Sequence, residues 1–256
     1  MSRRISHFSC GAASAVATKM SRPDAIWYCD TGGEDVDNAR FLRDCEAWFG
    51  QSVTILKSAK YKDVWDLWDK KSYLSGVAGA PCTGEMKVSL SRALELPDDV
   101  HIFGYTADSN DMRRADSLRA NWPDLSVETP LIDRGITKAA CLALLGKAGI
   151  SPPRVYAMGF HNANCIPCVK ATSPNYWALV RREFPEQFER MSKIEQRLNA
   201  KLTRIKGVRM QIKDIPEDQD TTEPIAPVCD FMCGLAEQDL EEEASIVNLL
   251  NSKKEI

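Results

Sequence analysis

The chain has 256 residues, of which 44% are hydrophobic, and its formal net charge at neutral pH is -3. This length supports one substantial hydrophobic core with a small appendage. The charge gives no overall basic field that would indicate a nucleic-acid-binding protein. The sequence has no apolar run of membrane-spanning length and no signal-peptide core, so we expect a cytoplasmic protein without a membrane partner.

The first two thirds of the sequence predict strands that alternate with helices. Short apolar runs predict strands at residues 5–9, 25–29, 52–56, 100–105 and 126–131. Helical patterns occur at about residues 12–20, 36–49, 64–68, 111–121 and 137–145. Such alternation implies right-handed crossovers and a mostly parallel α/β sheet with helices on both faces.

The segment Ser9–Ser14 follows the first predicted strand and opens the first predicted helix. Its small residues let a phosphate approach the backbone N–H groups and the helix N-terminus. The spacing differs from that of a Walker loop and of a dinucleotide fingerprint. We predict phosphate contacts from Ser9, Cys10, Gly11, Ala12, Ala13 and Ser14; the alternative is a closely packed turn without a ligand.

Ligands of parallel α/β sheets bind beyond the carboxyl ends of the strands. This rule groups Ser9–Ser14, Asp30–Gly33 and Gly104–Asp108 around one crevice. Asp30 is predicted to help hold Mg²⁺, because hard cations favour carboxylate oxygens, or else to cap a turn. Lys87 and the Arg113–Arg114 pair are candidate phosphate clamps, with a solvated helix face as the alternative.

Two of these segments resemble motifs of the phosphoadenylyl-sulfate (PAPS) reductase-like and N-type ATP pyrophosphatase families. The loop Ser9–Ser14 resembles their S-G-G-x-D-S loop, although Cys10 replaces a Gly and Ala13 replaces the Asp. Asp30–Gly32 with Glu34 resembles their D-T-G-x-E segment.

Further motifs follow in the family's order. Pro81–Thr83 with Lys87 resembles P-C-T-x-x-x-K. Gly104–Asp108 with Arg113–Arg114 is similar to G-x-R-x-x-E…R-R, although Thr106 stands in place of the Arg. The resemblance continues at Pro130–Leu131, Thr137–Lys138, Pro152–Pro153, Tyr156, Gly159–Phe160, Asn162–Lys170 and Tyr176–Trp177.

The resemblance covers about residues 5–190 and implies an adenine nucleotide alpha-hydrolase-like fold with a five-stranded sheet. We expect a nucleotide-binding domain over residues 1–172. The character of the sequence changes at Ser173, which predicts a helical extension, with an acidic linker and tail, over residues 173–256. The implied enzyme is an ATP pyrophosphatase-like transferase or a PAPS reductase-like oxidoreductase, in sulfur or nucleobase-modification chemistry. It would use ATP or PAPS with Mg²⁺, and a non-catalytic nucleotide-binding or interaction protein is the competing class.

This reading assigns roles to individual residues. Asp30, Lys87 and Cys233 are the predicted catalytic residues. The predicted nucleotide-binding residues are Ser9, Cys10, Gly11, Ala12, Ala13, Ser14, Asp30, Thr31, Gly32, Gly104, Tyr105 and Arg113.

The chain contains nine cysteines. In a cytoplasmic protein they are metal ligands, catalytic thiols or core residues more often than disulfides. The Cys165-x-x-Cys168 spacing brings two thiolates to one metal or cluster, with a redox dithiol as the alternative. We predict a site of Cys82, Cys165, Cys168 and Cys233, with Cys229 in reserve, and favour [4Fe–4S] over Zn²⁺. The remaining thiols at Cys29, Cys45 and Cys141 fit core positions, and Cys10 is either a reactive thiolate at a helix N-terminus or a Gly substitute.

The tripeptide Cys233–Leu235 resembles the C-G-L/I tail of sulfonucleotide reductases, whose Cys attacks the sulfur of the nucleotide. Those enzymes have Glu and His where this chain has Met232 and Ala236. True sulfonucleotide reduction by Cys233 is therefore the alternative enzymatic prediction. Among the three histidines, only His161 is a candidate metal ligand or catalytic group.

Apolar residues recur at helical spacing from Phe184 to Ile205, which predicts one long amphipathic helix. A basic stripe along its edge predicts contacts with tRNA or DNA, or else forms a solvated flank: Arg190, Lys193, Arg197, Lys201 and Arg204. The sequence predicts an extended acidic linker over residues 215–227 and a short acidic helix over residues 235–250. The acidic segment 214–243 is expected to compete for the stripe by folding over it. The acceptor is a nucleic acid or a small molecule, and a homodimer is compatible with the sequence.

Overall fold

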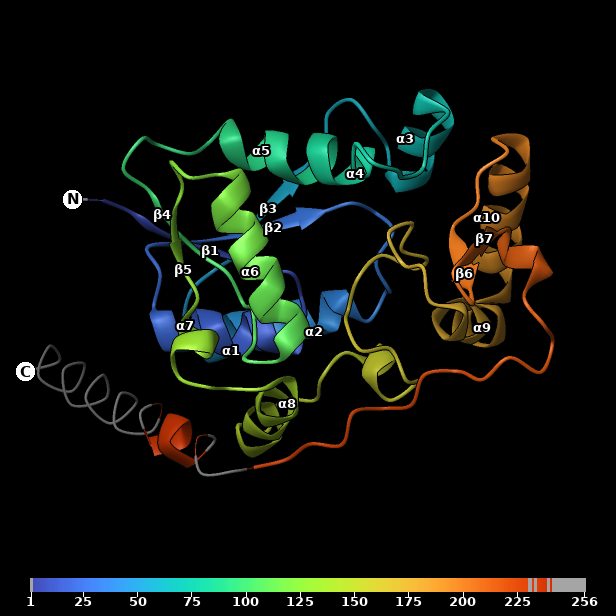
Figure 1. Ribbon diagram of the computed structural model, residues 1–256. Coiled ribbons are helices and arrows are strands. Elements are labelled where there is room, and N and C mark those ends of the chain that lie inside the picture. The colour runs from blue at the N-terminus through green and yellow to red at the C-terminus, as the bar shows by residue number, and fades with distance from the viewer. Residues whose placement is uncertain (1, 230–231, 233, 239, 241–256) are drawn as a thin grey trace, which may run out of the picture.

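The structure is a computed structural model that describes residues 2–229, 232, 234–238 and 240 (Figure 1). Its central sheet consists of β1 (Arg4–His7), β2 (Ala25–Asp30), β3 (Thr54–Lys57), β4 (Val100–Ile102) and β5 (Ser126–Glu128). The strands lie in the order β3-β2-β1-β4-β5, and every neighbouring pair is parallel. This confirms the predicted α/β fold with a five-stranded parallel sheet.

The strand order creates a switch point between β1 and β4. From β1 the chain moves to β2 and β3 on one side, and it then crosses to β4 and β5 on the other. At such a point the loops after the two central strands diverge and leave a crevice at their carboxyl ends. The loops after His7 and after Ile102 therefore border the same crevice.

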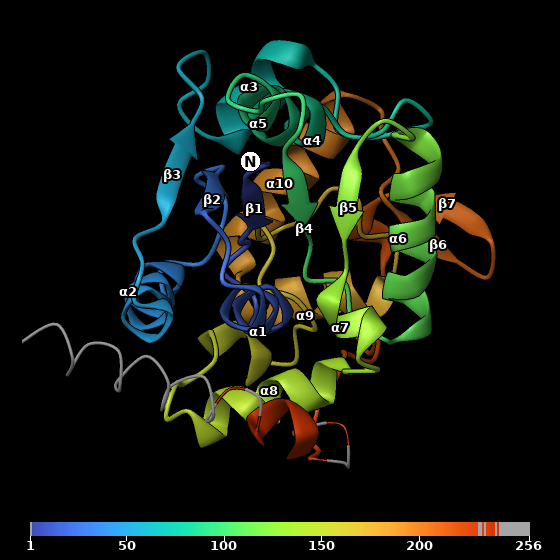
Figure 2. The same cartoon turned by 90° about the vertical axis from the view of Figure 1, so that its left-hand side faces the viewer.

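Helices cover both faces of the sheet (Figure 2). Four helices lie on one face: α1 (Ala12–Ser21), α2 (Asn38–Phe49), α7 (Pro130–Asp133) and α8 (Lys138–Lys147). Over the opposite face lie α3 (Val64–Lys71), α4 (Pro81–Thr83), the π-helix η1 (Gly84–Val88) and α5 (Ser89–Arg92), and α6 (Ser109–Asn121) runs along the β5 edge. The continuous helical segment from α4 to α5 was absent from the sequence prediction.

Helix α1 is buried almost completely, with nine of its ten residues inaccessible to solvent. It lies between the sheet and α8, so both of its sides face protein (Figure 2). The alanine-rich sequence of α1 suits this position, because small side chains allow close approach on both sides. On the opposite face of the sheet a smaller cluster joins Ile5, Trp27 and Leu56 to Leu90 of α5.

The prediction of one long helix from Phe184 to Ile205 is wrong. The chain instead forms α9 (Pro174–Glu183), α10 (Pro185–Arg197) and a hairpin of β6 (Thr203–Ile205) and β7 (Val208–Met210). Phe184 has an extended φ of −136°, since a residue before proline avoids the helical region. This break separates α9 from α10. Helix α10 then ends at Arg197, and Asn199 just beyond it has a left-handed φ of +48°. Lys201 and Arg204 therefore lie outside any helix, and the predicted stripe along one helix edge does not exist.

The extension from residue 173 onward shares the main hydrophobic core. Trp177 of α9 and Met191 of α10 are fully buried in it, as is Ile212 of the 3-10 turn η3 (Ile212–Asp214). Arg181 of α9 donates to the carbonyl oxygens of Ile215 and Pro216, at the start of the acidic segment. From there the segment runs in extended form below the body of the molecule (Figure 1), away from the β6–β7 hairpin.

Of the predicted acidic helix at 235–250, the structure describes only the beginning, and residues 232, 234–238 and 240 are helical. Cys233, the predicted nucleophile and metal ligand, lies outside the described residues. No helix in the described part of the chain is both long enough and apolar enough to cross a membrane.

Candidate functional site

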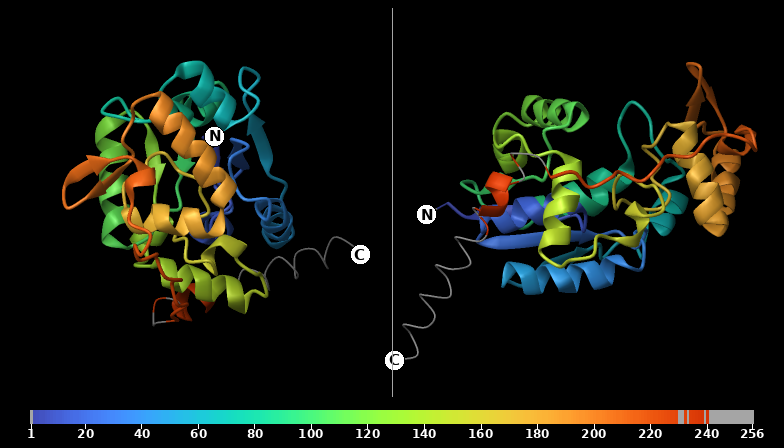
Figure 3. Two further views of the ribbon diagram at one scale, coloured as in Figure 1. Left: turned by 90° about the vertical axis from the view of Figure 1, so that its right-hand side faces the viewer. Right: turned by 90° about the horizontal axis from the view of Figure 1, so that it is seen from below.

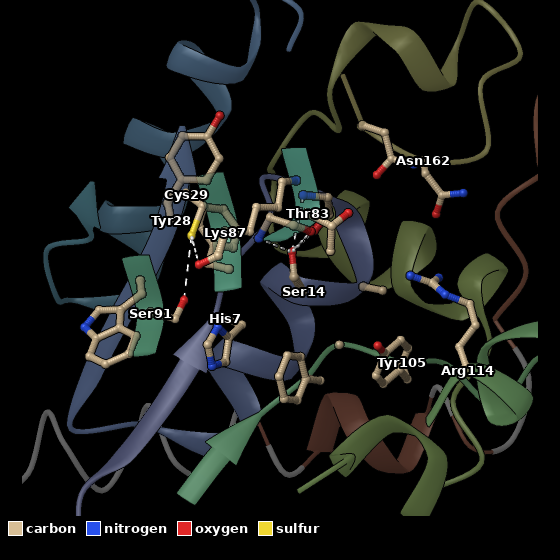
Figure 4. Close-up of a pocket in the computed structure, with 18 of the residues that line it drawn as sticks. His7, Ser14, Tyr28, Cys29, Thr83, Lys87, Ser91, Tyr105, Arg114 and Asn162 are labelled. Carbon is tan, nitrogen blue, oxygen red and sulfur yellow. Dashed lines mark hydrogen bonds between the residues drawn. The ribbon is translucent and has the colours of Figure 1, made fainter. Parts of the chain in front are cut away.

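A cavity of about 430 Å³ lies at the carboxyl ends of β1 and β4 (Figure 4). Its lining comes from the loop after β1, the helical segment from Cys82 to Glu95, α6, and the loop from Asn162 to Lys170. It also includes the ends of the central strands. A cavity is therefore present at the crevice predicted from the sheet topology, and six of the twelve predicted nucleotide-binding residues line it.

The loop after β1 is folded around the hydroxyl of Ser14. This oxygen accepts from the backbone N–H of Ser9 at 3.1 Å and of Gly11 at 3.3 Å, and it donates to the Gly11 carbonyl. The Ala12 N–H donates instead to Tyr156 Oη at 3.1 Å. The Ala13 and Ser14 amides belong to the first turn of α1 and have no acceptor within the helix. Both residues line the cavity, so the N-terminus of α1 opens onto it.

Cys10 and Ala12 do not line the cavity, unlike Ser9, Gly11, Ala13 and Ser14. Cys10 occupies a left-handed conformation with φ +52°, and its side chain is fully buried. Burial raises the pKa of the Cys10 thiol well above its ordinary value. The side chain is thus a protonated core group, and the reactive thiolate considered for this position is not favoured.

The chain after β4 passes directly against the first turn of α1. A Cβ atom on Gly104 would lie 2.6 Å from Ser14 Cα and 2.7 Å from Ser14 N. These are backbone atoms of a buried helix, and moving them would cost free energy because the helix is packed on both sides. Glycine at this position lets the two loops of the switch point meet and define one end of the cavity.

Five Lys or Arg side chains line the cavity: Lys87, Arg92, Arg114, Lys138 and Lys170. Arg114 lies over the Tyr105 ring at 5.1 Å and pairs with Asp111 at 2.7 Å (Figure 4). Lys138 donates to Asn162 Oδ1 at 3.1 Å. The neighbouring Arg113, which was the predicted ligand, is absent from the lining.

Arg113 is exposed and bonds Asn110 and the Ser109 carbonyl of its own helix. Of the Arg113–Arg114 pair, the structure therefore brings only the second residue to the cavity. Gly104 and Tyr105 line the cavity as predicted.

Lys87 lies in the cavity among acidic and thiol groups. Burial disfavours its charged form, but Cys165 and Glu34 hold the pKa of Lys87 above its ordinary value overall. Burial also raises the pKa of the Cys165 thiol, so this thiol is protonated at neutral pH. Glu34 is then the neighbour that carries negative charge toward Lys87.

Glu34, and not Asp30, is the carboxylate that this segment presents to the cavity. Asp30 pairs with Lys57 at 2.8 Å and accepts from the Gly32 N–H, and these residues line a separate hollow. Glu34 lines the main cavity and accepts from the Thr31 hydroxyl at 2.8 Å. The structure therefore does not bring Asp30 or Gly32 to the other predicted site residues, and Thr31 acts as a buried support for Glu34.

An aromatic floor of His7, Trp27 and Phe103 forms part of the cavity lining. His7 stacks on Phe103 with ring centroids 4.5 Å apart and planes 1° apart, and it meets Trp27 edge-on at 6.0 Å. His7 Nε2 is 2.9 Å from His101 Nδ1. Burial and then the neighbouring His101 lower the pKa of His7 to about 3, so the imidazole is neutral at physiological pH. A neutral aromatic surface of this kind accepts a planar heterocycle.

Sequence reasoning missed these floor residues. The available signal was strand alternation, because His7 and Trp27 are paired in register on β1 and β2 and therefore share one face.

Three of the predicted metal ligands, Cys82, Cys165 and Cys168, line the cavity. Cys165 Sγ lies 3.0 Å from Thr31 Oγ1, and burial raises the pKa of both Cys82 and Cys165. Across residues 2–229 and the described tail positions, no three His, Cys, Asp or Glu side chains are arranged to hold a metal ion. The described thiols therefore do not form a metal-binding site in this arrangement.

The remaining candidates lie elsewhere. Cys229 is exposed and lies beside the Lys147 amine at the end of α8. His161 is exposed, and its Nε2 bonds the Glu223 carbonyl at 2.9 Å, away from the cavity. Cys45 and Cys141 are buried core residues, as predicted, whereas Cys29 is half-buried and lines the cavity beside Ser91.

Comparison with known proteins does not assign the chain to a family. No model of a protein family matches the chain, and no curated protein sequence matches it.

Proposed function

We propose that this chain binds an adenine nucleotide in the cavity and is an ATP pyrophosphatase-like transferase or a PAPS reductase-like oxidoreductase. One observation carries the proposal: the N-terminus of α1 opens onto a switch-point cavity that Lys87, Arg114 and Lys138 also line. A helix N-terminus and convergent cations together favour a phosphorylated ligand. The motif resemblance makes adenine the expected base.

Two groups of lining residues suit the two parts of a nucleotide, its phosphates and its base. The Ala13 and Ser14 amides, with Lys87, Arg114 and Lys138, would hold the phosphates, where they neutralise charge and orient the reacting group. The neutral floor of His7, Trp27 and Phe103 would hold the base by stacking. A Mg²⁺ bound with the phosphates would find carboxylates in the cavity lining at Glu34, Glu95 and Asp111.

Arg114 and Arg113 provide a matched test of this binding mode. Arg114→Met should weaken the binding of ATP or PAPS about 10- to 100-fold, because a charge-assisted contact is lost. Arg113→Met should leave the affinity nearly unchanged, since this exposed side chain is absent from the cavity lining. Calorimetric titration measures both, and equal effects of the two substitutions would contradict the proposed phosphate site.

Product analysis separates the proposed activities from simple binding. An ATP pyrophosphatase-like enzyme releases AMP and pyrophosphate from ATP when the acceptor is supplied. A PAPS reductase-like enzyme instead converts PAPS to adenosine 3′,5′-bisphosphate and sulfite when a thiol reductant is supplied. The sulfonucleotide reduction would fail in Cys233→Ser, whereas nucleotide binding would persist. Tight binding with none of these products would favour the non-catalytic class.

A further inference from the structure

The β6–β7 hairpin is a short ribbon that projects from the body of the molecule (Figures 2 and 3). Its tip is Lys206–Gly207, whose φ values of +47° and +83° are those of a tight hairpin turn. The base is anchored, because Thr203 is fully buried and its hydroxyl donates to the Thr172 carbonyl at 3.1 Å. The ribbon is therefore a positioned element and not a loose loop.

The ribbon carries a concentrated positive charge. Residues 201–213 contain five Lys or Arg and no Asp or Glu, in a chain whose net charge is -3. All five are exposed: Lys201, Arg204, Lys206, Arg209 and Lys213. Within the part of the chain that the structure describes, none of them forms an ion pair, whereas Arg182, Lys193 and Arg197 of the adjoining helices pair with acids.

The register of the hairpin brings two of these positive charges together. Arg204 and Arg209 lie directly opposite each other on the two strands. Like charges at opposite positions destabilise a sheet, so folding alone does not favour this pair. A bound polyanion would remove the repulsion by placing negative charge between the two guanidinium groups.

We propose that the β6–β7 ribbon binds the phosphate backbone of a nucleic acid. Its cations are spread over a protruding hairpin and do not converge in a pocket, which fits an extended polyanion better than a single phosphate. A two-stranded ribbon also matches the width of the major groove of a duplex. In Figure 1 the ribbon lies beyond the carboxyl end of β2, the end of the sheet that carries the cavity.

Two triple variants with the same charge change test this inference. The ribbon variant is Arg204→Gln/Lys206→Gln/Arg209→Gln, and the control is Arg182→Gln/Lys193→Gln/Arg197→Gln, whose cations are paired on α9 and α10. Fluorescence anisotropy with a short random-sequence DNA duplex measures the binding from about 50 to about 200 mM salt. The slope of log affinity against log salt should fall by roughly three units in the ribbon variant, and much less in the control.

Equal binding by the two variants, or absence of binding by the unmodified chain at the lowest salt, would overturn the inference. Binding to anionic lipid vesicles but not to the duplex would also overturn it. ATP titration of the ribbon variant should give the unmodified affinity, which shows that the variant is folded. This arm also separates failure of the ribbon proposal from failure of the proposed nucleotide site.

Discussion

At the scale of single residues, the cavity depends on a few positions where two elements nearly touch. Gly104 lies against the backbone of Ser14, and the Tyr156 hydroxyl reaches the Ala12 N–H from a segment far along the chain. These contacts hold the loop after β1 in one conformation before any ligand binds. A preorganised loop binds a phosphate at lower entropic cost than a flexible one.

The contact at Gly104 yields a stability prediction. Gly104→Ala should destabilise the protein by about 1–3 kcal/mol, because the added methyl group would overlap the backbone of α1. Gly146→Ala in α8 is the matched control, since no atom lies within 4 Å of its added Cβ. That control should stabilise the protein by about 0.5–1 kcal/mol through its helix propensity. Urea unfolding measures both, and a neutral Gly104→Ala would refute the tight contact.

The predicted metal centre is also decided at individual residues. Cys82, Cys165 and Cys168 share the cavity, and the fourth predicted ligand, Cys233, lies outside the described residues. If the sequence prediction holds, anaerobically purified protein is brown and contains iron and sulfide, and Cys168→Ser lowers the metal content. Stoichiometric zinc in a colourless protein would refute the cluster, and absence of any metal would refute the site. The exposed Cys229→Ser is the control that should retain the metal.

At the scale of elements, the extension is held together by a buried acid of α10. Glu195 is fully buried and accepts from the backbone N–H of Leu202 and of Ile212, each at 2.7 Å. These two donors flank the β6–β7 hairpin on its two sides. One carboxylate therefore fixes the base of the ribbon to the helix.

These two hydrogen bonds predict that Glu195→Gln destabilises the hairpin locally. The amide has only one oxygen, so one buried N–H would lose its acceptor, which costs about 1–3 kcal/mol. Hydrogen exchange should accelerate at Leu202 or Ile212 before it changes in the central sheet. Glu189→Gln on the exposed side of α10 should change stability by less than about 0.5 kcal/mol. Unchanged exchange in Glu195→Gln would show that the hairpin is held by other contacts.

At the scale of the whole molecule, the partly buried His7 couples folding to pH. Its pKa is lowered to about 3 in the folded protein by burial and then by His101, whereas an unfolded histidine titrates near 6.5. Between these values the unfolded chain binds more protons. The stability contribution is therefore present above about pH 6.5 and is lost as the pH falls toward 3.

We expect the free energy of unfolding to fall by about 1–2 kcal/mol from this group between about pH 7 and pH 5. His7→Gln should remove most of that dependence, while the exposed His161→Gln should retain it. Urea denaturation at several pH values measures the difference. Identical pH slopes in all three proteins would show that His7 is accessible to protons in the folded state.

The sequence alone determined the parts of this protein that depend on local pattern. The alternation of strands and helices is visible because apolar residues repeat with the period of each element. The rule that ligands bind beyond the carboxyl ends of parallel strands grouped Ser9–Ser14, Asp30–Gly33 and Gly104–Asp108 around one crevice. The first and third of these segments reach the cavity, whereas Asp30–Gly33 does not line it. Pro185 is a readable signal for the start of α10, because proline is tolerated at the first position of a helix.

Only the tertiary structure decided which side chains enter the cavity. Arg113 and Arg114 are adjacent in sequence but differ by about 100° around the helix, so packing of α6 selects the second. Glu34 reaches the cavity while Asp30 is held by Lys57. The floor of His7 and Phe103 unites two strands that are far apart along the chain but adjacent in the sheet. Such contacts depend on how elements meet in space, and no local period in the sequence encodes them.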